Sequence, residues 1–411
     1  MQRLISLSGL LVMVALAFAM SADRRKVDLR LVAAGVGLQF LLALLVLRTG
    51  PGQALFSHVG ALATTLLNYV DAGSSFVFGE QFGDHFFAFK VLPTIIFFSA
   101  LMGVLYHLGL VQPLVAAFAW VMRRTLGTSG AESLAAAANI FVGQTEAPLV
   151  VRPYVAAMTR SELMALMVGG FATIAGGVLA AFVGLGIDPG HLLSASVISA
   201  PAALMAAKVI QPEVETPTTL GKVEVRVERT GGNVVEAAAN GTLDGLRLAL
   251  NVGAMLIAAL GLIALLDGVI GLLGRGVGQV LGTEALPWSL SAALGYFFAP
   301  FAWLMGIEAG DCLRAGELLG KKMVINEFVS YVQLSQWMQP GSGVDLSQRS
   351  VVILTYALCG FANFSSIGIQ IGGIGGIAPE RRSELARLGF RAMLGGTLAC
   401  FMTACVAGIL L

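Results

Sequence analysis

The stretch Asn139-Ile140-Phe141-Val142-Gly143-Gln144-Thr145-Glu146-Ala147-Pro148 decides how this chain folds, because it places polar side chains and a carboxylate within a strongly apolar sequence. Gly143 weakens a helix interior and Pro148 removes a backbone donor, so one continuous helix through the stretch is disfavoured. We predict two half-helices that meet at a turn, with Pro148 in the first turn of the second half-helix and Thr145 as its cap. At membrane depth, such a broken backbone is stable only where it is buried in protein or lines an aqueous cavity. The stretch is therefore a candidate binding site.

Composition places the chain among the all-α polytopic membrane proteins. Hydrophobic residues make up 57% and charged residues 12% of the 411 residues, and the mean hydropathy is +0.84, whereas soluble domains carry roughly a quarter charged residues. The net charge of +1 gives no indication of nucleic acid as a partner, so none is expected. The four cysteines lack metal-ligand spacing and are interpreted as buried thiols, and the four scattered histidines are assigned no chemistry.

Apolar runs divide the chain into eight expected transmembrane helices, with two re-entrant hairpins and several interfacial helices between them. The expected spans are 4–22, 31–47, 91–112, 163–187, 191–209, 246–266, 351–378 and 393–411. The hairpins are expected within 129–158 and 307–339, and the interfacial helices within 50–84, 113–126 and 286–305. Small and polar residues interrupt the fourth span at 173–177 and the seventh at 363–366. The hydrophilic stretch 211–244 is predicted to be a cytoplasmic loop, with a short strand at its alternating Val223, Val225 and Val227 as the other interpretation.

The distribution of Lys and Arg predicts the orientation in the membrane. Arg24-Arg25-Lys26 follow the first apolar run instead of preceding it, which is typical of a membrane anchor and not of a cleaved signal peptide. With eight spans and an external N-terminus, most cationic residues outside the spans fall on the cytoplasmic side. Arg314, Lys321 and Lys322 in the second hairpin region count against this orientation. On balance, both termini are expected on the external side of the inner (plasma) membrane.

An internal repeat points to a transport mechanism. Gly170-Phe171-Ala172-Thr173 and Gly360-Phe361-Ala362-Asn363 share their first three residues, and each lies in or beside the break of an interrupted span. A hairpin region with a glutamate precedes each of them, with Glu146 in the first and Glu327 in the second. The number of intervening spans predicts that the two broken helices enter the membrane from opposite faces. Inverted repeats with broken helices in corresponding positions are typical of secondary transporters with a site near the midplane.

Several of these motifs together resemble the concentrative nucleoside transporters. The motifs are Gly143-Gln144-Thr145-Glu146, the run 192–208 (LLSASVISAPAALMAAK) with Pro212-Glu213 beyond it, Asn326-Glu327-Phe328-Val329, and Gly360-Phe361-Ala362-Asn363-Phe364-Ser365-Ser366. The resemblance covers nearly the whole chain and is densest over 139–376. We expect the bacterial form, because the sequence begins without the extra N-terminal spans of the animal members, and the sodium-coupled type, because its pattern of an Asn and a hydroxyl is met by Asn139 and Thr173. The order of the motifs along the chain makes the resemblance specific, since any one motif alone would be weak.

The resemblance implies a homotrimer in the lipid bilayer, in which each protomer moves a transport domain against a scaffold in an elevator-type motion. Residues 1–112 would form scaffold spans one to three with an external interfacial helix, and 211–285 a cytoplasmic loop with scaffold span six. Residues 113–210 and 286–411 would form the two halves of the transport domain. The implied activity is sodium-coupled import of nucleosides. Proton coupling, or transport of another small polar solute, remains the alternative.

The resemblance also implies roles for individual residues, and their chemistry agrees with these roles. Ribose hydroxyls would be bound by Glu327, Asn363 and Ser366, whose side chains accept or exchange hydrogen bonds with hydroxyl groups. The base edge would be bound by Gln144 and Thr145, and by Glu146 directly or through water, with Val178 and Phe361 as apolar walls. The alternative for the two glutamates is a structural role, in which each carboxylate is paired and holds helices together. Carboxylates within a membrane span usually belong to a functional site, so we expect a functional role.

The coupling ion is expected to be sodium, held by neutral oxygen atoms. By resemblance, its ligands are the side chains of Asn139 and Thr173 with the backbone carbonyls of Val142 and Ile174. Carbonyl groups freed where a helix unwinds are suited to hold a hard cation in a transporter. For Thr173, as for Ser365, the alternative role is helix packing through a small residue. No organic cofactor is implied.

Two other functional classes fit the sequence less well. A membrane enzyme would need a reactive constellation, and the chain has no HExxH, no P-loop lysine pattern and no GxSxG elbow. A passive channel would carry a polar stripe along whole spans, whereas polar residues here gather at paired breaks. The sequence therefore favours a transporter and not an enzyme.

Overall fold

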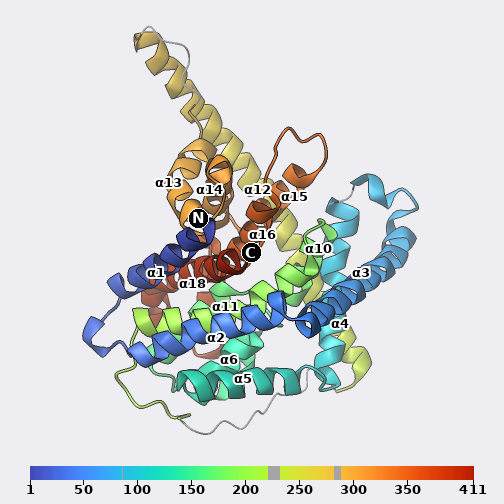
Figure 1. Cartoon of the computed structure of the whole chain (residues 1–411). Helices are drawn as coiled ribbons and strands as arrows, with labels where there is room; N and C mark the ends of the chain where they lie inside the picture. Colours follow the sequence, from blue (N-terminus) through green and yellow to red (C-terminus); the bar gives the residue numbers. More distant parts are fainter. Residues whose placement is uncertain (86, 221–231, 282–287) are drawn as a thin grey trace.

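The computed structural model describes residues 1–85, 87–220, 232–281 and 288–411, and within these ranges the chain is helical and has no strand (Figure 1). The all-α fold predicted from composition is confirmed. The helices in chain order are α1 (Gln2–Ala19), α2 (Leu29–Arg48), α3 (Gly50–Phe78), α4 (Leu92–His107), α5 (Gln112–Leu126), α6 (Gly130–Ala138), α7 (Ala147–Val150), α8 (Arg152–Val155), α9 (Arg160–Ala172), α10 (Gly176–Gly184), α11 (Pro189–Ile210), α12 (Val234–Leu281), α13 (Leu290–Leu304), α14 (Cys312–Val324), α15 (Glu327–Met338), α16 (Gln348–Leu358), α17 (Phe364–Ile377) and α18 (Arg382–Leu410).

The helices account for the predicted membrane passes. Seven helical stretches among the described residues are long and apolar enough to cross a bilayer: Gln2–Ala19, Leu29–Arg48, Phe87–His107, Arg160–Gly184, Pro189–Ile210, Val234–Gly276 and Pro379–Leu410. They correspond to predicted spans one to six and eight. The seventh predicted span consists of the shorter helices α16 and α17, which are separated at 359–363. The chain thus has the polytopic membrane architecture that its hydropathy predicts.

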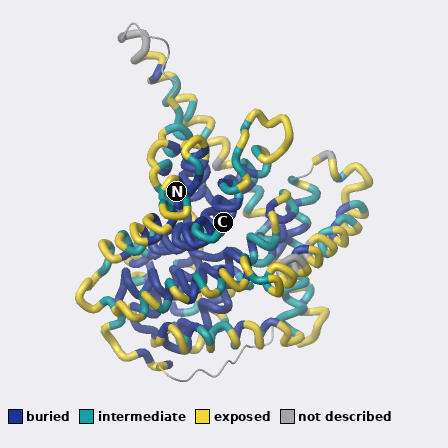
Figure 2. Tube along the Cα trace, in the orientation of Figure 1, coloured by how far each residue is buried: buried dark blue, intermediate teal, exposed yellow. Residues whose placement is uncertain are grey.

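Helices α9, α11 and α18 pack against one another and form the centre of the molecule. In the most apolar window of α11, 94% of the residues are buried within the protein, compared with 12% in α12. Figure 2 shows the same contrast, with buried residues gathered at the centre and exposed residues along α1 to α3 and α12. Protein therefore surrounds α11, whereas the exposed apolar side chains of α12, such as Leu265, are suited to face lipid.

The first hairpin has the predicted turn but not the predicted cap. α6 ends at Ala138 and α7 begins at Ala147, so the polar stretch forms the turn between them, and Pro148 lies in the first turn of α7 as predicted. Thr145 is not the cap, because Glu146 occupies that position and no side chain supplies a cap hydrogen bond. The second arm is two short helices, since Pro153 lacks a backbone N–H and lies at the start of α8.

The two broken spans are interrupted in different ways. In the first, α9 ends at Ala172 and α10 begins at Gly176, which agrees with the predicted break at 173–177. In the second, the break lies at 359–363 and the prediction of 363–366 is wrong, because α17 already begins at Phe364. The cause is local: the Asn363 Oδ1 accepts a hydrogen bond from the Ser366 N–H at 2.9 Å and caps α17.

Helix α12 is much longer than the predicted span 246–266. It contains 48 residues, which corresponds to about 72 Å at a rise of 1.5 Å per residue, and it projects past its neighbours in Figure 1. The predicted cytoplasmic loop is therefore wrong for 234–244, which is helical, while 212–220 is a loop. The alternating valines at 223, 225 and 227 lie outside the described residues.

Two glycines allow the start of α12 to pack closely against α4. A Cβ atom on Gly241 would lie 2.5 Å from the Ser99 carbonyl oxygen, and one on Gly245 would lie 2.8 Å from the Ile96 Cα. These glycines therefore allow α12 to pack against α4 at backbone distance, as small residues do between membrane helices. Composition does not predict this contact, because residues 234–244 are as polar as a typical loop.

Candidate functional site

The breaks in the two interrupted spans lie against each other at the centre of the protein. The Phe361 N–H donates a hydrogen bond to the Thr173 carbonyl oxygen at 3.3 Å. A Cβ atom on Gly360 would lie 2.7 Å from the Phe171 carbonyl oxygen, so only glycine permits this approach. The tip of the first hairpin joins the same place, because the Gly176 N–H donates to the Phe141 carbonyl oxygen at 3.3 Å. Residues from both repeats are thereby brought together.

The predicted ribose-binding group is assembled from the second hairpin and α17. Glu327 is the first residue of α15 and is 5% exposed, and the Asn363 Nδ2 donates to its Oε2 at 3.1 Å. Ser366 is 2% exposed and lies in the first turn of α17, which Asn363 caps. The carboxylate also lies at a helix N-terminus, where negative charge is favoured. The structure therefore joins all three predicted residues.

A buried lysine whose place in the site was not predicted lies beside this group. Lys322 is 1% exposed, and its Nζ donates to the Ala357 carbonyl oxygen at 2.8 Å, in the last turn of α16. Unpaired carbonyl groups at a helix C-terminus carry partial negative charge, so an ammonium group is favoured there. Lys322 therefore supplies positive charge at the same break that holds Asn363.

The predicted base-binding residues adjoin the ribose group directly. The Gln144 Nε2 donates to the Ser366 Oγ at 3.2 Å. Thr145 is half-buried, and its Cγ2 packs over Gly373 of α17. Glu146 is exposed, and its carboxylate lies over Gly143, outside the hydrogen-bonded chain that links Gln144 with Ser366.

The two predicted apolar wall residues lie in or just after the two breaks. Val178 is buried on α10, just after the first break. Phe361 is half-buried in the second break, and its backbone is held by Thr173. Both residues therefore belong to segments that the hydrogen bond between Phe361 and Thr173 brings together.

The predicted cation ligands converge on α9. Asn139 is 1% exposed, and neither its Oδ1 nor its Nδ2 has a hydrogen-bond partner among the described residues. Its amide packs against Gly169, and the Thr173 Oγ1 donates to the carbonyl oxygen of the same glycine at 2.9 Å. Buried amide groups are normally hydrogen-bonded, so the orphaned Asn139 amide fits a site that an ion completes.

The two residues expected to contribute carbonyl groups lie at the same junction. Val142 follows Phe141, whose carbonyl oxygen is bound by Gly176, and Ile174 is buried within the first break. The hairpin tip and the break thus place all four expected ligands in one region.

Family models match successive parts of the chain. "Na+ dependent nucleoside transporter N-terminus" matches residues 8–81, "Nucleoside recognition" matches 88–188, and "Na+ dependent nucleoside transporter C-terminus" matches 191–408. The chain belongs to the concentrative nucleoside transporter family. This finding confirms the resemblance that the sequence motifs indicate.

Relatives within the family are transporters and not enzymes. Solute carrier family 28 member 3 of Homo sapiens is 46% identical over 420 residues, which cover 100% of this chain and 60% of that protein. The chain thus spans about 60% of the length of this relative. An uncharacterized transporter of Haemophilus influenzae is 44% identical, with 100% of this chain and 98% of that protein covered.

Solved structures of the family protein CNTnw have the same fold. Its inward-facing, substrate-bound state matches with a TM-score of 0.91 and 41% identity, over 100% of this chain and 98% of that one. A double variant of the same protein in an outward-facing state matches with a TM-score of 0.92 and 42% identity, over 100% of this chain and 97% of that one.

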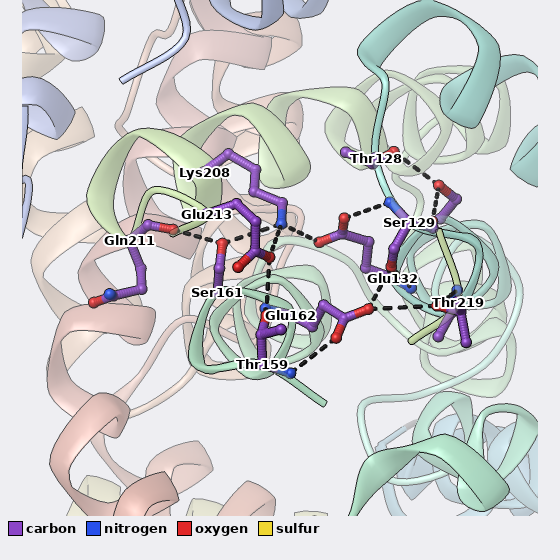
Figure 3. A network of polar contacts seen from close by, with 12 residues as sticks. Thr128, Ser129, Glu132, Thr159, Ser161, Glu162, Lys208, Gln211, Glu213 and Thr219 are labelled. Atoms are coloured by element: carbon purple, nitrogen blue, oxygen red, sulfur yellow. Dashed lines mark hydrogen bonds and ion pairs between the residues drawn. The ribbon is translucent and has the colours of Figure 1, made fainter. Parts of the chain in front are cut away.

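Besides Lys322, two features of this family member were not predicted from the sequence. One is Gln370, a single amide in the apolar run of α17, which contacts Gln144. The other is a buried polar network at the start of the first hairpin (Figure 3). Its sequence signal is a pair of capping boxes, Ser129 with Glu132 and Thr159 with Glu162.

The network fastens the first hairpin to the helices behind it. The Lys208 Nζ lies 2.7 Å from the Glu132 Oε2 and 3.1 Å from the Glu213 Oε2. The Ser129 Oγ donates to the Glu162 Oε1 at 2.5 Å, which links the two capping boxes. Figure 3 shows these side chains converging from α6, α9, α11 and the segment after α11. The base of the hairpin is therefore held by charge and hydrogen bonds, while its tip carries the candidate site.

Proposed function

We propose that the protein imports nucleosides across the inner membrane together with sodium, as a secondary active transporter. The observation that carries the proposal is one hydrogen-bonded assembly across both repeats, in which Gln144 contacts Ser366 and Asn363 contacts Glu327. These side chains are nearly dry, and they offer both donors and acceptors. A nucleoside presents hydroxyl donors on the ribose and mixed donors and acceptors on the base, so its polarity matches that of the assembly.

In this proposal each end of the nucleoside has its own set of residues. The Glu327 carboxylate accepts from ribose hydroxyls, and such charge-assisted bonds are stronger than neutral ones. Asn363 and Ser366 bind the same hydroxyls, while Gln144 and Thr145 bind the base edge and Glu146 reaches it directly or through water. Val178 and Phe361 form the apolar walls.

Sodium binds, we propose, between the Asn139 and Thr173 side chains and the Val142 and Ile174 carbonyls. The Thr173 hydroxyl uses its proton on the Gly169 carbonyl, so its oxygen lone pairs remain for a cation. An ion in this place would tie the hairpin tip to the break, and the same tip carries Gln144 and Thr145. Sodium and nucleoside would then strengthen each other's binding by the same factor.

The proposed movement is of the elevator type, in a homotrimer whose protomer termini are both external. Residues 113–210 and 286–411 would move together, and the polar network at Lys208 and Glu132 supports a rigid first half. Residues 1–112 and 211–285 would form the scaffold, which the close packing of α4 on α12 supports.

Uptake into proteoliposomes tests the proposal. Purified protein is reconstituted, and uptake of radiolabelled uridine, cytidine, adenosine and inosine is measured under a sodium gradient, a proton gradient or neither. We expect uphill accumulation of unaltered nucleoside under the sodium gradient only. Accumulation driven by the proton gradient would show that protons and not sodium are the coupling ion. Equilibration without accumulation would indicate a channel.

A further inference from the structure

Gln370 lies directly behind the residue that we assign to the nucleoside base. It is 0% exposed, and its Nε2 donates to the Gln144 Oε1 and to the Met167 carbonyl oxygen, both at 3.1 Å. Ser366 and Gln370 are four residues apart on α17 and share one helix face, so both contact the same Gln144 side chain. Gln144 is therefore held from two sides by one helix.

The chemistry of these contacts fixes which way both amides point. A backbone carbonyl oxygen only accepts hydrogen bonds, so Gln370 must present its Nε2 to Met167. The Gln144 atom that faces this Nε2 must then be its acceptor, Oε1, which leaves the Gln144 Nε2 on the other side, facing Ser366. The orientation of Gln144 is thus set by a backbone carbonyl of α9 through Gln370.

Packing holds this arrangement in place. A Cβ atom on Gly170 would lie 2.8 Å from the Gln370 Nε2 and 2.9 Å from the Gln144 Cβ. The glycine therefore leaves space for the two glutamines at their contact with α9. Because the Gln370 amide is fully buried, breaking its bonds would leave polar groups without partners, which is costly.

One amide hydrogen of Gln144 remains for the base. Its Nε2 carries two hydrogens, and the Ser366 Oγ takes one of them. We propose that Gln370 is a positioning residue that determines specificity, by making Gln144 present an N–H donor to the nucleoside base. A donor in this place matches a carbonyl oxygen, such as O4 of uracil or O6 of hypoxanthine. It opposes the amino group that cytosine and adenine carry at the corresponding position.

The inference rests on the proposed function, and transport kinetics test it. kcat/KM for uridine and cytidine, and for inosine and adenosine, is measured in proteoliposomes for wild type and for Gln370→Met. Gln370→Met keeps the side-chain length but removes the donor, so the Gln144 amide is free to turn. The control is Ile369→Met, which changes the adjacent, exposed side chain of the same helix.

We expect wild type to favour the carbonyl-bearing nucleoside of each pair by roughly fivefold or more, the value of about one hydrogen bond. In Gln370→Met this ratio should fall to within about twofold, and in Ile369→Met it should stay as in wild type. A merely structural role would lower uptake of all four nucleosides and leave both ratios unchanged, which would overturn the inference. So would a wild type that favours the amino-bearing nucleosides.

Two further variants keep the test decisive. In a Gln144→Met background, adding Gln370→Met should leave the ratios as they are, because Gln370 acts through Gln144; a further change would contradict this route. Gln370→Asn retains an amide but is too short to bond both Met167 and Gln144. It should lower the ratios as Gln370→Met does, and it serves as the test if Gln370→Met fails to fold.

Absence of any nucleoside uptake by wild type would refute the proposed function itself, whereas uptake with unaltered ratios refutes only the role of Gln370.

Discussion

The backbone N–H of Phe361 donates a hydrogen bond to the carbonyl oxygen of Thr173, with 3.3 Å between the two heavy atoms. These residues lie 188 positions apart, each in the unwound part of a different interrupted span. A backbone group freed by one break therefore satisfies a group freed by the other, which is how irregular backbone is stabilised at membrane depth. This hydrogen bond also places the expected cation ligand Thr173 beside the expected wall residue Phe361.

Replacing Glu327 by glutamine should weaken nucleoside binding. An amide is a poorer acceptor for ribose hydroxyls than a carboxylate, and the loss should be roughly 1.5–3 kcal/mol, or about ten- to a hundredfold in Kd. Equilibrium binding to purified protein measures it. Glu317→Gln is the matched control, because Glu317 lies in the same hairpin but pairs with Lys321. Unchanged uridine affinity in a folded Glu327→Gln protein would remove Glu327 from the site.

Replacing Thr173 by valine should reduce the effect of sodium on nucleoside affinity. The hydroxyl oxygen is one of the proposed ligands, and a methyl group of similar size supplies no lone pair. Nucleoside affinity is titrated against sodium in detergent, with Thr403→Val as control. Thr403 is equally buried and also bonds the carbonyl four residues earlier, but it lies in α18. If wild-type affinity itself does not depend on sodium, coupling must be assigned to protons.

A cross-link between α2 and α11 should stop transport. A Cβ atom on Gly35 would lie 2.8 Å from the Met205 Cβ, so cysteines at both positions are close enough to join after a small backbone shift. If residues 1–112 are the scaffold and 113–210 move, oxidation should abolish uptake and a reducing agent should restore it. Each single cysteine variant serves as control. Full uptake by the oxidised protein would place α2 in the moving part.

Loss of the buried ammonium group in the first half should destabilise the protein. Lys208→Met leaves Glu132, which is 1% exposed, without its ion-pair partner, at a cost of about 3–5 kcal/mol. Thermal unfolding in detergent should show a lower Tm, and adding Glu132→Gln should recover part of the loss. Arg247→Met is the comparison, since the Arg247–Asp244 pair is exposed and should contribute little. Equal Tm values for Lys208→Met and wild type would rule out a stabilising role for the network.

Glycine, proline and polar residues in an apolar chain predicted that two spans are interrupted, and they placed the first hairpin's turn and the first break correctly. Gly143 and Pro148 marked the first turn correctly, because their effects on a helix are local. The beginning of α12 was not predicted, since Gly241 packs there against α4, a contact between segments far apart in the sequence. The second break was predicted too far along the chain, because Asn363 caps α17. In sequence, a polar residue that caps a helix cannot be told from one that interrupts it.

Residues of the candidate site differ in how far sequence could identify them. Those in dense motifs, such as Gln144 and Glu327, stood out from their apolar surroundings. Gln370 did not, because one amide within an apolar helix has no meaning until its partners are known. The capping boxes at Ser129 and Thr159 had a local signal, but the link between them is tertiary.

The Asn363 side chain makes two different interactions. Its Oδ1 caps α17, and its Nδ2 donates a hydrogen bond to the Glu327 carboxylate. Aspartate, serine and threonine can also cap a helix, but none of them offers an amide hydrogen to a carboxylate. In a mutational scan read separately for protein abundance and for growth on nucleosides, those three should therefore be tolerated by the first readout and rejected by the second. Selection for stability alone would thus accept several capping residues at this position, and only the added requirement for the Glu327 contact restricts it to asparagine.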